Sequence, residues 1–472
     1  MTLSINLHTT VVKINTKINT KINTKINTKI NTKINTKINT KINQKINLKI
    51  NKKEFRYPIV VALIFIFCVA FTCSTKLLPN NSISNTKPQY FSPTPEIAGS
   101  SIMDMFEREV IVPDSIERVV GTGPGALRYI VYMNGTEKVV GVENIERDEE
   151  IDPETEMRPY NLAHPELREL PSIGPIFGGD KELIAAAEPD IVITTNYKQA
   201  ADLDDLQTSL GIPVIGLIYG DLDENIGILW EGLNITSQLL GTYSDVFLPF
   251  KSYVQNIIGD LNSRTSEIEE SEKLFCYVGG VSYHGSHGID STSPSYDPFD
   301  LVNAKNVAEE LGGIQTIVDP EQILAWNPDV LFIDGGGFAL VIDDLQSGVY
   351  DTLTSVINSN IYILLPYNFY TANFASILID AYYVGTVLFP EEFSDINMNV
   401  TAADIYENFV GTDVFDLIMN NFKNRADTTE SALSKLSANL IGDDNINGYF
   451  ITLIILVNFI GIAYFRIKLR KE

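Results

Sequence analysis

The sequence of 472 residues is poor in the side chains that build disulfide frameworks and metal sites. It contains three cysteines and four histidines. Cys68 and Cys73 lie in one apolar run, which leaves Cys276 alone in the rest of the chain, so neither a disulfide framework nor a CxxC metal site is expected. The P-loop, HExxH and GxSxG motifs are also missing, and the histidines form no evident Ser/His/Asp set. We therefore expect a protein that is not an enzyme.

Positive charge is scarce outside the two ends of the chain. The formal net charge is −25, but the first 56 residues carry 13 basic and 1 acidic side chains, and the last seven carry 4 and 1. Removing these contributions of +12 and +3 leaves −40 on residues 57–465. A body this acidic is repelled by phosphate backbones, which argues against a nucleic-acid partner.

The changes of charge coincide with two apolar runs. Residues 57–73, with the run PIVVALIFIFCVAFTC, are expected to form a signal or anchor segment, and residues 449–465 (YFITLIILVNFIGIAYF) a C-terminal transmembrane anchor. Cations flank each run on its outer side, so the positive-inside rule predicts cytoplasmic basic tails and an extracytoplasmic body at the cell membrane. A buried core helix is the alternative for each run, and Cys73 is an alternative lipid-attachment residue.

The N-terminal tail is repetitive. From Lys13 the chain repeats KINT seven times and continues with KINQ, KINL and KINK. A period of four matches neither a helix nor a strand, so residues 1–56 are predicted to be a basic low-complexity tail. Residues 74–106 are rich in Ser, Asn, Thr and Pro and are expected to be a tether.

Short aliphatic runs alternate with helical stretches twice in the remaining chain. The first set includes VVGT, KVVGVE, DIVITT and PVIGLIY, and the second includes KLFCYVGG, DVLFIDGGG and IYILLPYNFY. This alternation predicts parallel sheets covered by helices. Between the sets, apolar residues recur at spacings of three and four from Phe247 to Leu261, which predicts a long amphipathic helix. We expect an α/β fold with a ligand cleft between two lobes: an N-terminal lobe at 107–243, a linking helix at 244–273 and a C-terminal lobe at 274–440.

One sequence pattern, the doubled phrase, occurs twice. It reads ELIAAAEPDIVI from Glu182 and EQILAWNPDVLF from Glu321, and the two starts are 139 residues apart (321 − 182). In each copy the proline ends a helix, and the following aliphatic run begins a strand. Asp319 is predicted to cap the second helix, with a looser cap at Asp180 in the first. Each glutamate then lies in a first helical turn, where it either complements the helix dipole or belongs to a duplicated docking element.

The two copies and their surroundings resemble the class III periplasmic binding proteins. The resemblance covers about Glu109 to Gly411 and is carried by ERVVGTGPGALRYI, EKVVGVE, LPSIGPIFGGDKELIAAAEPDIVITT, LGIPVIGL and EQILAWNPDVLFI. These proteins are the solute receptors of ABC importers for ferric siderophores, haem, cobalamin and related metal chelates. The resemblance implies a monomer that delivers a metal chelate, a ferric siderophore first, to a permease and its ATPase, with no permanent cofactor. A cobalamin or haem receptor, or a surface adhesive or structural protein that lost transport, remains an alternative.

The resemblance also implies roles for particular residues. Glu182 and Glu321 correspond to the family's exposed acids that pair with arginines of the permease. Ligand contacts are expected from loops at the strand ends, where glycines and aromatic rings suit a bulky chelate. These residues are Gly123, Pro124, Ile176, Phe177, Tyr197, Tyr219, Tyr283, His284, His287, Tyr367 and Tyr370. His284 and His287, spaced as HxxH, are candidate metal contacts, although a Gly-Ser-His loop is equally typical of a solvent loop.

Overall fold

The computed structural model describes residues 100–428, except 148–155, 224, 284 and 314, and these belong to one compact unit. The KINT tail, both apolar runs and residues 74–99 of the expected tether lie outside the described residues, as does His284. The tether was predicted to extend to residue 106, but residues 100–103 form a strand and belong to the folded body. Within the described ranges, no helix is both long enough and apolar enough to cross a membrane. The expected membrane segments and tails therefore stay predictions.

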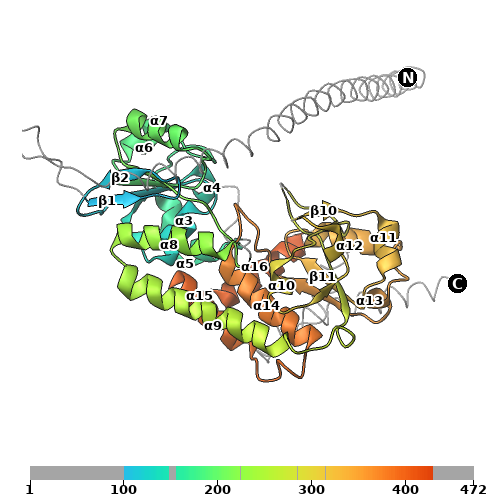
Figure 1. Ribbon diagram of the computed structural model, residues 1–472. Coiled ribbons are helices and arrows are strands. Elements are labelled where there is room, and N and C mark those ends of the chain that lie inside the picture. The colour runs from blue at the N-terminus through green and yellow to red at the C-terminus, as the bar shows by residue number, and fades with distance from the viewer. Residues whose placement is uncertain (1–99, 148–155, 224, 284, 314, 429–472) are drawn as a thin grey trace, which may run out of the picture. The chain divides into compact units, whose positions relative to one another are not determined.

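The N-terminal lobe is built on a parallel sheet of four strands (Figure 1). Its strand order is β4-β3-β5-β6, and every neighbouring pair is parallel. The two central strands are buried along their whole length, as expected when helices cover both faces. The strands are β3 (Val119–Thr122), β4 (Val139–Gly141), β5 (Ile191–Thr194) and β6 (Val214–Gly216), and an antiparallel hairpin of β1 (Ser100–Met103) and β2 (Glu109–Val112) precedes them.

Helices connect the strands of this lobe. The longest is α8, which is buried over most of its residues and packs on α3. The helices are α3 (Ala126–Tyr132), α4 (Asn144–Arg147), α5 (Pro159–Ala163), α6 (Lys181–Ala186), α7 (Ala200–Leu210) and α8 (Ile226–Leu240), with the 3₁₀ turns η1 (Thr136–Lys138) and η3 (Pro165–Glu169).

The C-terminal lobe has a second parallel sheet, in the order β12-β11-β7-β9. Its strands are β7 (Phe275–Gly279), β9 (Lys305–Asn306), β11 (Val330–Asp334) and β12 (Ile361–Leu364), and β8 (Ser291–Thr292) pairs with β10 (Thr316–Ile317) in a separate antiparallel ribbon. The connecting elements are α10 (Asp297–Asp300), η5 (Glu309–Leu311), α11 (Pro320–Trp326), α12 (Phe338–Gln346) and α13 (Thr354–Ile357).

The two sheets share one topology. In each, the first strand along the chain lies between the second and the third, and the fourth pairs with the third. β5 and β11 are the third strands, and each begins within one copy of the doubled phrase, directly after its Pro-Asp pair. The repeated sequence therefore marks equivalent places in two lobes with the same strand order, which confirms the expected α/β fold with parallel sheets.

The Pro-Asp pair of each copy has the same structural role. The residue before each proline, Glu188 or Asn327, has a positive φ of 47° and ends the preceding helix. Asp190 then accepts hydrogen bonds from the two backbone N–H groups just before β3, at 2.8 and 2.9 Å. Asp329 accepts one from the N–H of Phe275 at the start of β7, at 3.0 Å. Each Asp thus joins the start of the third strand to the start of the first.

The helix caps differ from the prediction. Asp180 is the stronger cap, because its carboxylate accepts the N–H groups of Glu182 and Leu183, both at 3.0 Å. Asp319 makes no capping hydrogen bond with its side chain. α11 begins with Pro320, which lacks an N–H group and presets the helical φ, so fewer free amides remain to be capped there.

A helical segment joins the lobes. A π-helical turn, η4 (Tyr243–Phe247), leads directly into α9 (Leu248–Thr265), as Figure 1 shows. Phe250, Val254 and Leu261 are buried on one face of α9, as the predicted spacing requires.

Of the three C-terminal helices, the first packs on α10 of the C-terminal lobe, and the last two return to the N-terminal lobe. The three helices are α14 (Phe374–Leu388), α15 (Met398–Val410) and α16 (Phe415–Thr428). α15 packs on α3 and α5, and α16 packs on α5 (Figure 1). Phe409 of α15 meets Tyr132 of α3 edge-on, with ring centroids 5.1 Å apart. One buried hydrophobic cluster consequently runs through both lobes.

Candidate functional site

A glycine loop after β3 begins the site. Gly123 and Gly125 have φ values of 86° and 87°, in the left-handed region that favours glycine. A Cβ at Gly125 would lie 2.1 Å from Cε2 of Tyr219, so only glycine lets this ring lie against the loop. Tyr219 stacks between Tyr129 and Phe374, with ring centroids 4.7 and 5.1 Å apart. Phe374 begins α14, so this stack already joins the two halves of the chain.

The loop between β12 and α14, residues 365–373, brings Tyr370 to the same place. Its hydroxyl donates to Oε2 of Glu143 at 2.8 Å and accepts the N–H of Phe177 at 2.9 Å. The rings of Phe177 and Tyr370 also meet edge-on, 5.6 Å apart. Tyr370 and Thr371 both have positive φ values, of 48° and 71°, a costly conformation for residues with side chains.

Glu143 forms hydrogen bonds with two loops of the N-terminal lobe. It follows β4, its exposed fraction is 2 %, and its carboxylate accepts the N–H groups of Gly123 at 3.0 Å and Gly178 at 2.8 Å. Burial raises the pKa of this carboxyl, although the hydrogen bonds from Gly178, Tyr370 and Gly123 act in the opposite direction. Sequence reasoning missed Glu143. The available signal was an acid directly after a buried strand, at the edge where parallel sheets bind ligands.

Arg128 is the second residue that sequence reasoning missed. Only 1 % of it is exposed, and its guanidinium donates to the backbone oxygens of Ala372 at 2.8 Å, Tyr370 at 2.7 Å and Phe369. Its charge lies over the ring of Tyr160, 5.2 Å from the centroid. Among the described residues no carboxylate forms an ion pair with Arg128, and its Nε has no hydrogen-bond partner. The available signal was a lone cation in the apolar helix ALRYIVY.

The other predicted ligand residues are placed less centrally. The carbonyl of Pro124 accepts the hydroxyl of Thr195 at 2.8 Å, and the ring of Tyr367 packs on Tyr296, with centroids 5.6 Å apart. The remaining three, Ile176, Tyr197 and Tyr283, are 41 % exposed, half-buried and 50 % exposed, respectively.

The histidine loop offers one described imidazole. Nε2 of His287 lies 2.8 Å from the backbone oxygen of Tyr283. A carbonyl can only accept, so Nε2 carries the proton and Nδ1 alone remains for a ligand. In the described part of the chain, no group of three or more His, Cys, Asp or Glu side chains is placed to hold a metal ion. The metal contact of His284 and His287 stays a prediction.

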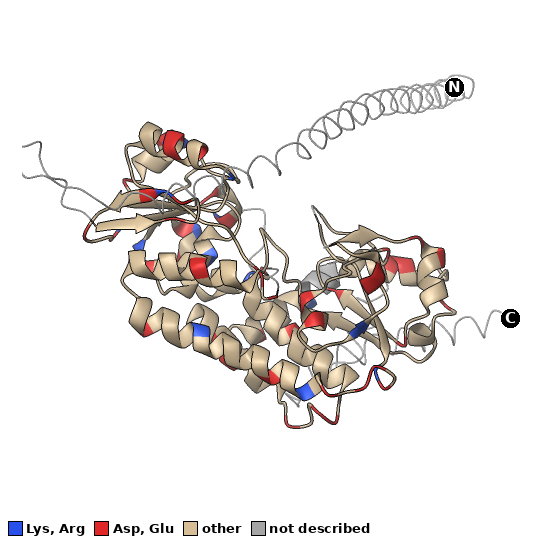
Figure 2. Ribbon diagram, viewed as in Figure 1, with Lys and Arg blue, Asp and Glu red and all other residues tan. Residues whose placement is uncertain are grey.

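The two candidate docking acids occupy matching positions. Glu182 lies in the first turn of α6 and Glu321 in the first turn of α11, and both are exposed. Neither carboxylate forms a hydrogen bond or ion pair with any described residue. Acidic residues are spread over the helices of both lobes (Figure 2), so exposure alone does not distinguish these two. Their equivalent positions in the two lobes do.

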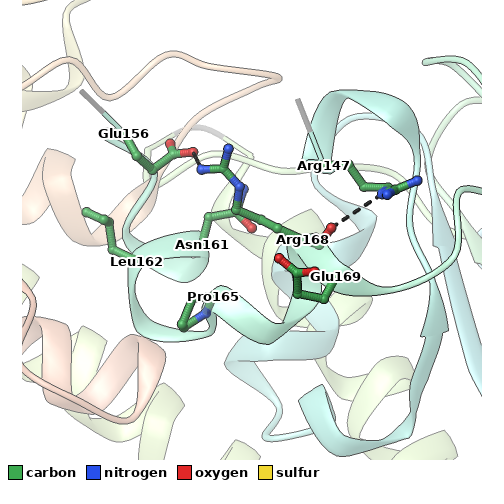
Figure 3. Close-up of a pocket in the computed structure, with 7 residues that line it drawn as sticks. All are labelled: Arg147, Glu156, Asn161, Leu162, Pro165, Arg168 and Glu169. Atoms are coloured by element: carbon green, nitrogen blue, oxygen red, sulfur yellow. Dashed lines mark hydrogen bonds and ion pairs between the residues drawn. The ribbon is translucent and has the colours of Figure 1, made fainter. Parts of the chain in front are cut away.

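A cavity of about 340 Å³ lies in the N-terminal lobe, apart from these loops (Figure 3). Three of its four charged residues are bound to protein groups: Arg168 donates to Glu156 at 3.4 Å, and Arg147 donates to the backbone oxygen of Arg168 at 3.3 Å. It is lined by Arg147, Glu156, Asn161, Leu162, Pro165, Arg168 and Glu169. None of the predicted ligand residues lines it.

Comparison with known proteins identifies the relatives of this fold. A family model described as periplasmic binding protein matches residues 120–366, more than half of the 472-residue chain. The molybdate-binding protein MolA of Haemophilus influenzae is 21 % identical over 341 residues, which cover 67 % of this chain and 92 % of MolA.

Two solved structures share the fold. MolA of Haemophilus influenzae bound to molybdate, the periplasmic binding protein of an ABC transporter, superposes with a TM-score of 0.53 at 19 % identity, covering 66 % of this chain and 98 % of MolA. A periplasmic solute-binding protein from Veillonella parvula gives a TM-score of 0.55 at 18 % identity, covering 69 % of this chain and 97 % of its own.

Proposed function

Because this chain belongs to the periplasmic binding protein family, we propose that it captures an anionic metal chelate and delivers it to a partner ABC permease. Members of the family are extracytoplasmic substrate-binding proteins of ABC importers, and they are receptors rather than enzymes. The proposal adds the class of ligand, with a ferric siderophore as the first candidate, and the residues that bind it. It also includes an ATPase partner, a membrane tether and a monomeric state.

The convergence of aromatic rings and a buried cation carries this proposal. Phe177 presents ring surface from a loop of the N-terminal lobe and is 54 % exposed, whereas the ring of Tyr219 is half-buried between Tyr129 and Phe374. Arg128 places a positive charge beside them, and Tyr370 brings the loop of the C-terminal lobe to the same point. Ring faces supply contact area for a bulky ligand, and a buried guanidinium favours an anionic one.

A second candidate ligand is a small oxyanion such as molybdate. The observation that favours it is the similarity to MolA, which is named for molybdate and matches over most of its own length. Arg128 suits this ligand as well, because a guanidinium fork binds two oxygens of one anion. Haem and cobalamin differ from an oxyanion in size, so one panel of ligands separates these candidates.

We further propose that Glu182 and Glu321 dock on the permease. Both carboxylates are exposed and occupy the same position of the duplicated unit, one in each lobe. A helix dipole explains an acid in a first turn, worth about 0.3–1 kcal/mol, but it does not require that the carboxylate be left without partners in both lobes. A pair of basic sockets on the permease would engage both at once.

A ligand panel tests the proposed function. The purified full-length chain is mixed with ferric siderophores, haem, cobalamin, molybdate and free metal ions, and its thermal unfolding is measured. We expect one class to raise the midpoint, because a ligand at 100 times its Kd stabilises the folded state by about 2.7 kcal/mol. If every member leaves the midpoint unchanged while the chain binds cell-wall polymer, the protein is an adhesin and the proposal is wrong.

A further inference from the structure

We propose that Arg128 is the anion-recognition residue of this protein, and that the loop of residues 365–373 occupies it as an internal ligand until an anionic solute displaces the loop. The inference rests on the proposed function, namely that the chain binds a solute among these loops. It adds a residue, a chemical class of ligand and a competing segment of the same chain.

Two buried arginines differ in their partners. Arg158 is 1 % exposed and bonds to two carboxylates, with Glu156 at 2.6 and 2.8 Å and Glu146 at 3.2 Å. Arg128 is equally buried, yet its acceptors among the described residues are backbone oxygens and one hydroxyl, that of Tyr219 at 3.4 Å. A buried charge without an opposite charge costs several kcal/mol. Arg158 is therefore a structural ion pair, whereas no described carboxylate bonds to Arg128, and the buried Glu146 attracts it only from a distance.

The backbone acceptors of Arg128 come from a single loop. Three backbone oxygens, those of Phe369, Tyr370 and Ala372, converge on one guanidinium. They come from a segment about 240 residues away in the sequence, and two residues of that segment have positive φ values. A residue with a side chain costs about 1–3 kcal/mol in this conformation. The bound position of the loop therefore includes backbone strain.

An anion would form stronger hydrogen bonds with Arg128 than the loop does. Hydrogen bonds between two charged groups are roughly twice as strong as those to neutral acceptors. The buried Nε of Arg128, which has no partner among the described residues, offers one more donor. The ligand should therefore present at least two oxygens of an anionic group to Arg128. A carboxylate or catecholate of a ferric chelate and a tetrahedral oxyanion share this chemistry.

The test measures affinity by titration calorimetry with the full-length chain. The probes are ferric citrate and sodium molybdate, with a cationic ferric trihydroxamate as the comparison, so the arms separate a chelate from a free oxyanion. We expect an anionic probe to bind, and Arg128→Gln to weaken it about 10- to 100-fold, because a hydrogen bond to a charged group contributes about 1.5–3 kcal/mol. Arg128→Lys should recover part of the loss.

A matched control is Arg118→Gln. Arg118 also donates to backbone oxygens alone, those of Glu188 at 2.7 Å and Ala187 at 2.6 Å, but it is exposed and remote from the loops. We expect its affinity to equal that of the wild type. Thermal unfolding of each unliganded variant checks that it folds. If Arg128→Gln does not fold, the affinity of Arg128→Lys decides the test.

Tyr370→Phe tests the internal ligand separately. This change removes the phenol's hydrogen bonds to Glu143 and to the N–H of Phe177 and leaves Arg128 in place. The loop should then compete less well, and the same anion should bind about 3- to 10-fold more tightly, because each hydrogen bond is worth about 1 kcal/mol. Weaker binding would show that Tyr370 contacts the ligand and that the loop is no competitor.

The outcomes separate the inference from the proposed function. If the wild type binds an anion and Arg128→Gln binds it equally or more tightly, Arg128 only holds the loop, and the inference is overturned while the receptor function stands. If the wild type binds the cationic trihydroxamate and neither anion, the receptor function stands and anion recognition is wrong. If no member of the wider panel binds, the proposed function falls and the inference with it.

Discussion

Asp334 is a buried carboxylate at the end of β11, next to the glycine loop that follows it. It accepts the N–H of Gly336 at 2.8 Å and the hydroxyl of Tyr296 at 3.2 Å, and none of the ion pairs in the described ranges includes it. Burial raises the pKa of Asp334 from 3.8 to about 7, against the effect of these two hydrogen bonds. The folded state therefore holds a proton here that the unfolded chain releases.

This shift predicts the pH dependence of stability. Between about pH 4 and pH 7 the folded state binds more protons than the unfolded state, so the free energy of unfolding falls as the pH rises. Across this pH range, Asp334 lowers the free energy of unfolding by about 4 kcal/mol, because its pKa is raised by about three units. In urea unfolding measured from pH 4 to pH 8, Asp334→Asn should reduce the slope of the free energy of unfolding against pH by the amount that corresponds to about one bound proton. An unchanged slope would show that Asp334 is ionised in the folded protein at neutral pH.

The residues of the site could be predicted only in part. The loops that carry Phe177, Tyr219 and Tyr370 follow from their positions at strand ends. The structure brings Phe177 against Tyr370, and the hydroxyl of Tyr219 donates to the backbone oxygen of Ala372, in the same loop as Tyr370. Glu143 and Arg128 were missed because their roles depend on partners far away in the sequence, 227 residues for Glu143 with Tyr370 and 244 for Arg128 with Ala372. A single sequence shows a lone acid and a lone cation but not the loop that each one meets.

At the scale of elements, two glycines of similar appearance should respond oppositely to alanine. Gly125 has a φ of 87°, and an added Cβ would overlap the ring of Tyr219 at 2.1 Å. Gly259 lies inside α9, and nothing lies within 4 Å of its added Cβ. Gly125→Ala should lower the free energy of unfolding by about 1–3 kcal/mol, and Gly259→Ala should raise it by about 0.5–1 kcal/mol.

Denaturant unfolding of both variants checks these values, and titration adds a second readout. Gly125→Ala should also weaken ligand binding, because it displaces Tyr219 from the loop, whereas Gly259→Ala should bind as the wild type does. Equal stabilities for the two variants would contradict the close packing of Tyr219 on the glycine loop.

The elements themselves were largely predictable, and their ends were less so. Aliphatic runs and three-to-four spacing are local signals, and they predict the buried strands and α9. The caps were assigned in the wrong order because Asp180 and Asp319 have similar sequence contexts, and Pro320 changes how many amides need an acceptor. The return of α15 to the N-terminal lobe was also beyond the sequence, since an amphipathic pattern defines a buried face but not the surface that covers it.

At the scale of the whole molecule, the doubled phrase has one part with a structural role and one part without. Asp190 and Asp329 join strands in both lobes, which explains why Pro-Asp recurs. Glu182 and Glu321 have no such role among the described residues. We therefore propose that the two glutamates bind the permease.

Charge reversal tests this assignment. The double variant Glu182→Arg and Glu321→Arg should reduce uptake of the bound ligand below about a tenth of the wild-type rate, because each arginine would face a basic socket. Its ligand affinity should be unchanged. The matched control reverses Glu231 on α8 and Glu407 on α15, which are also exposed, and should transport normally. Normal uptake by the first pair would remove the docking role.

The central claim is that this chain is a receptor for an anionic solute, and calorimetric titration of the full-length protein tests it most directly. The account predicts saturable binding of one ligand per chain for a ferric chelate or molybdate, with affinity that falls when Arg128 is replaced by glutamine. Heats of dilution alone for every member of the panel would contradict it.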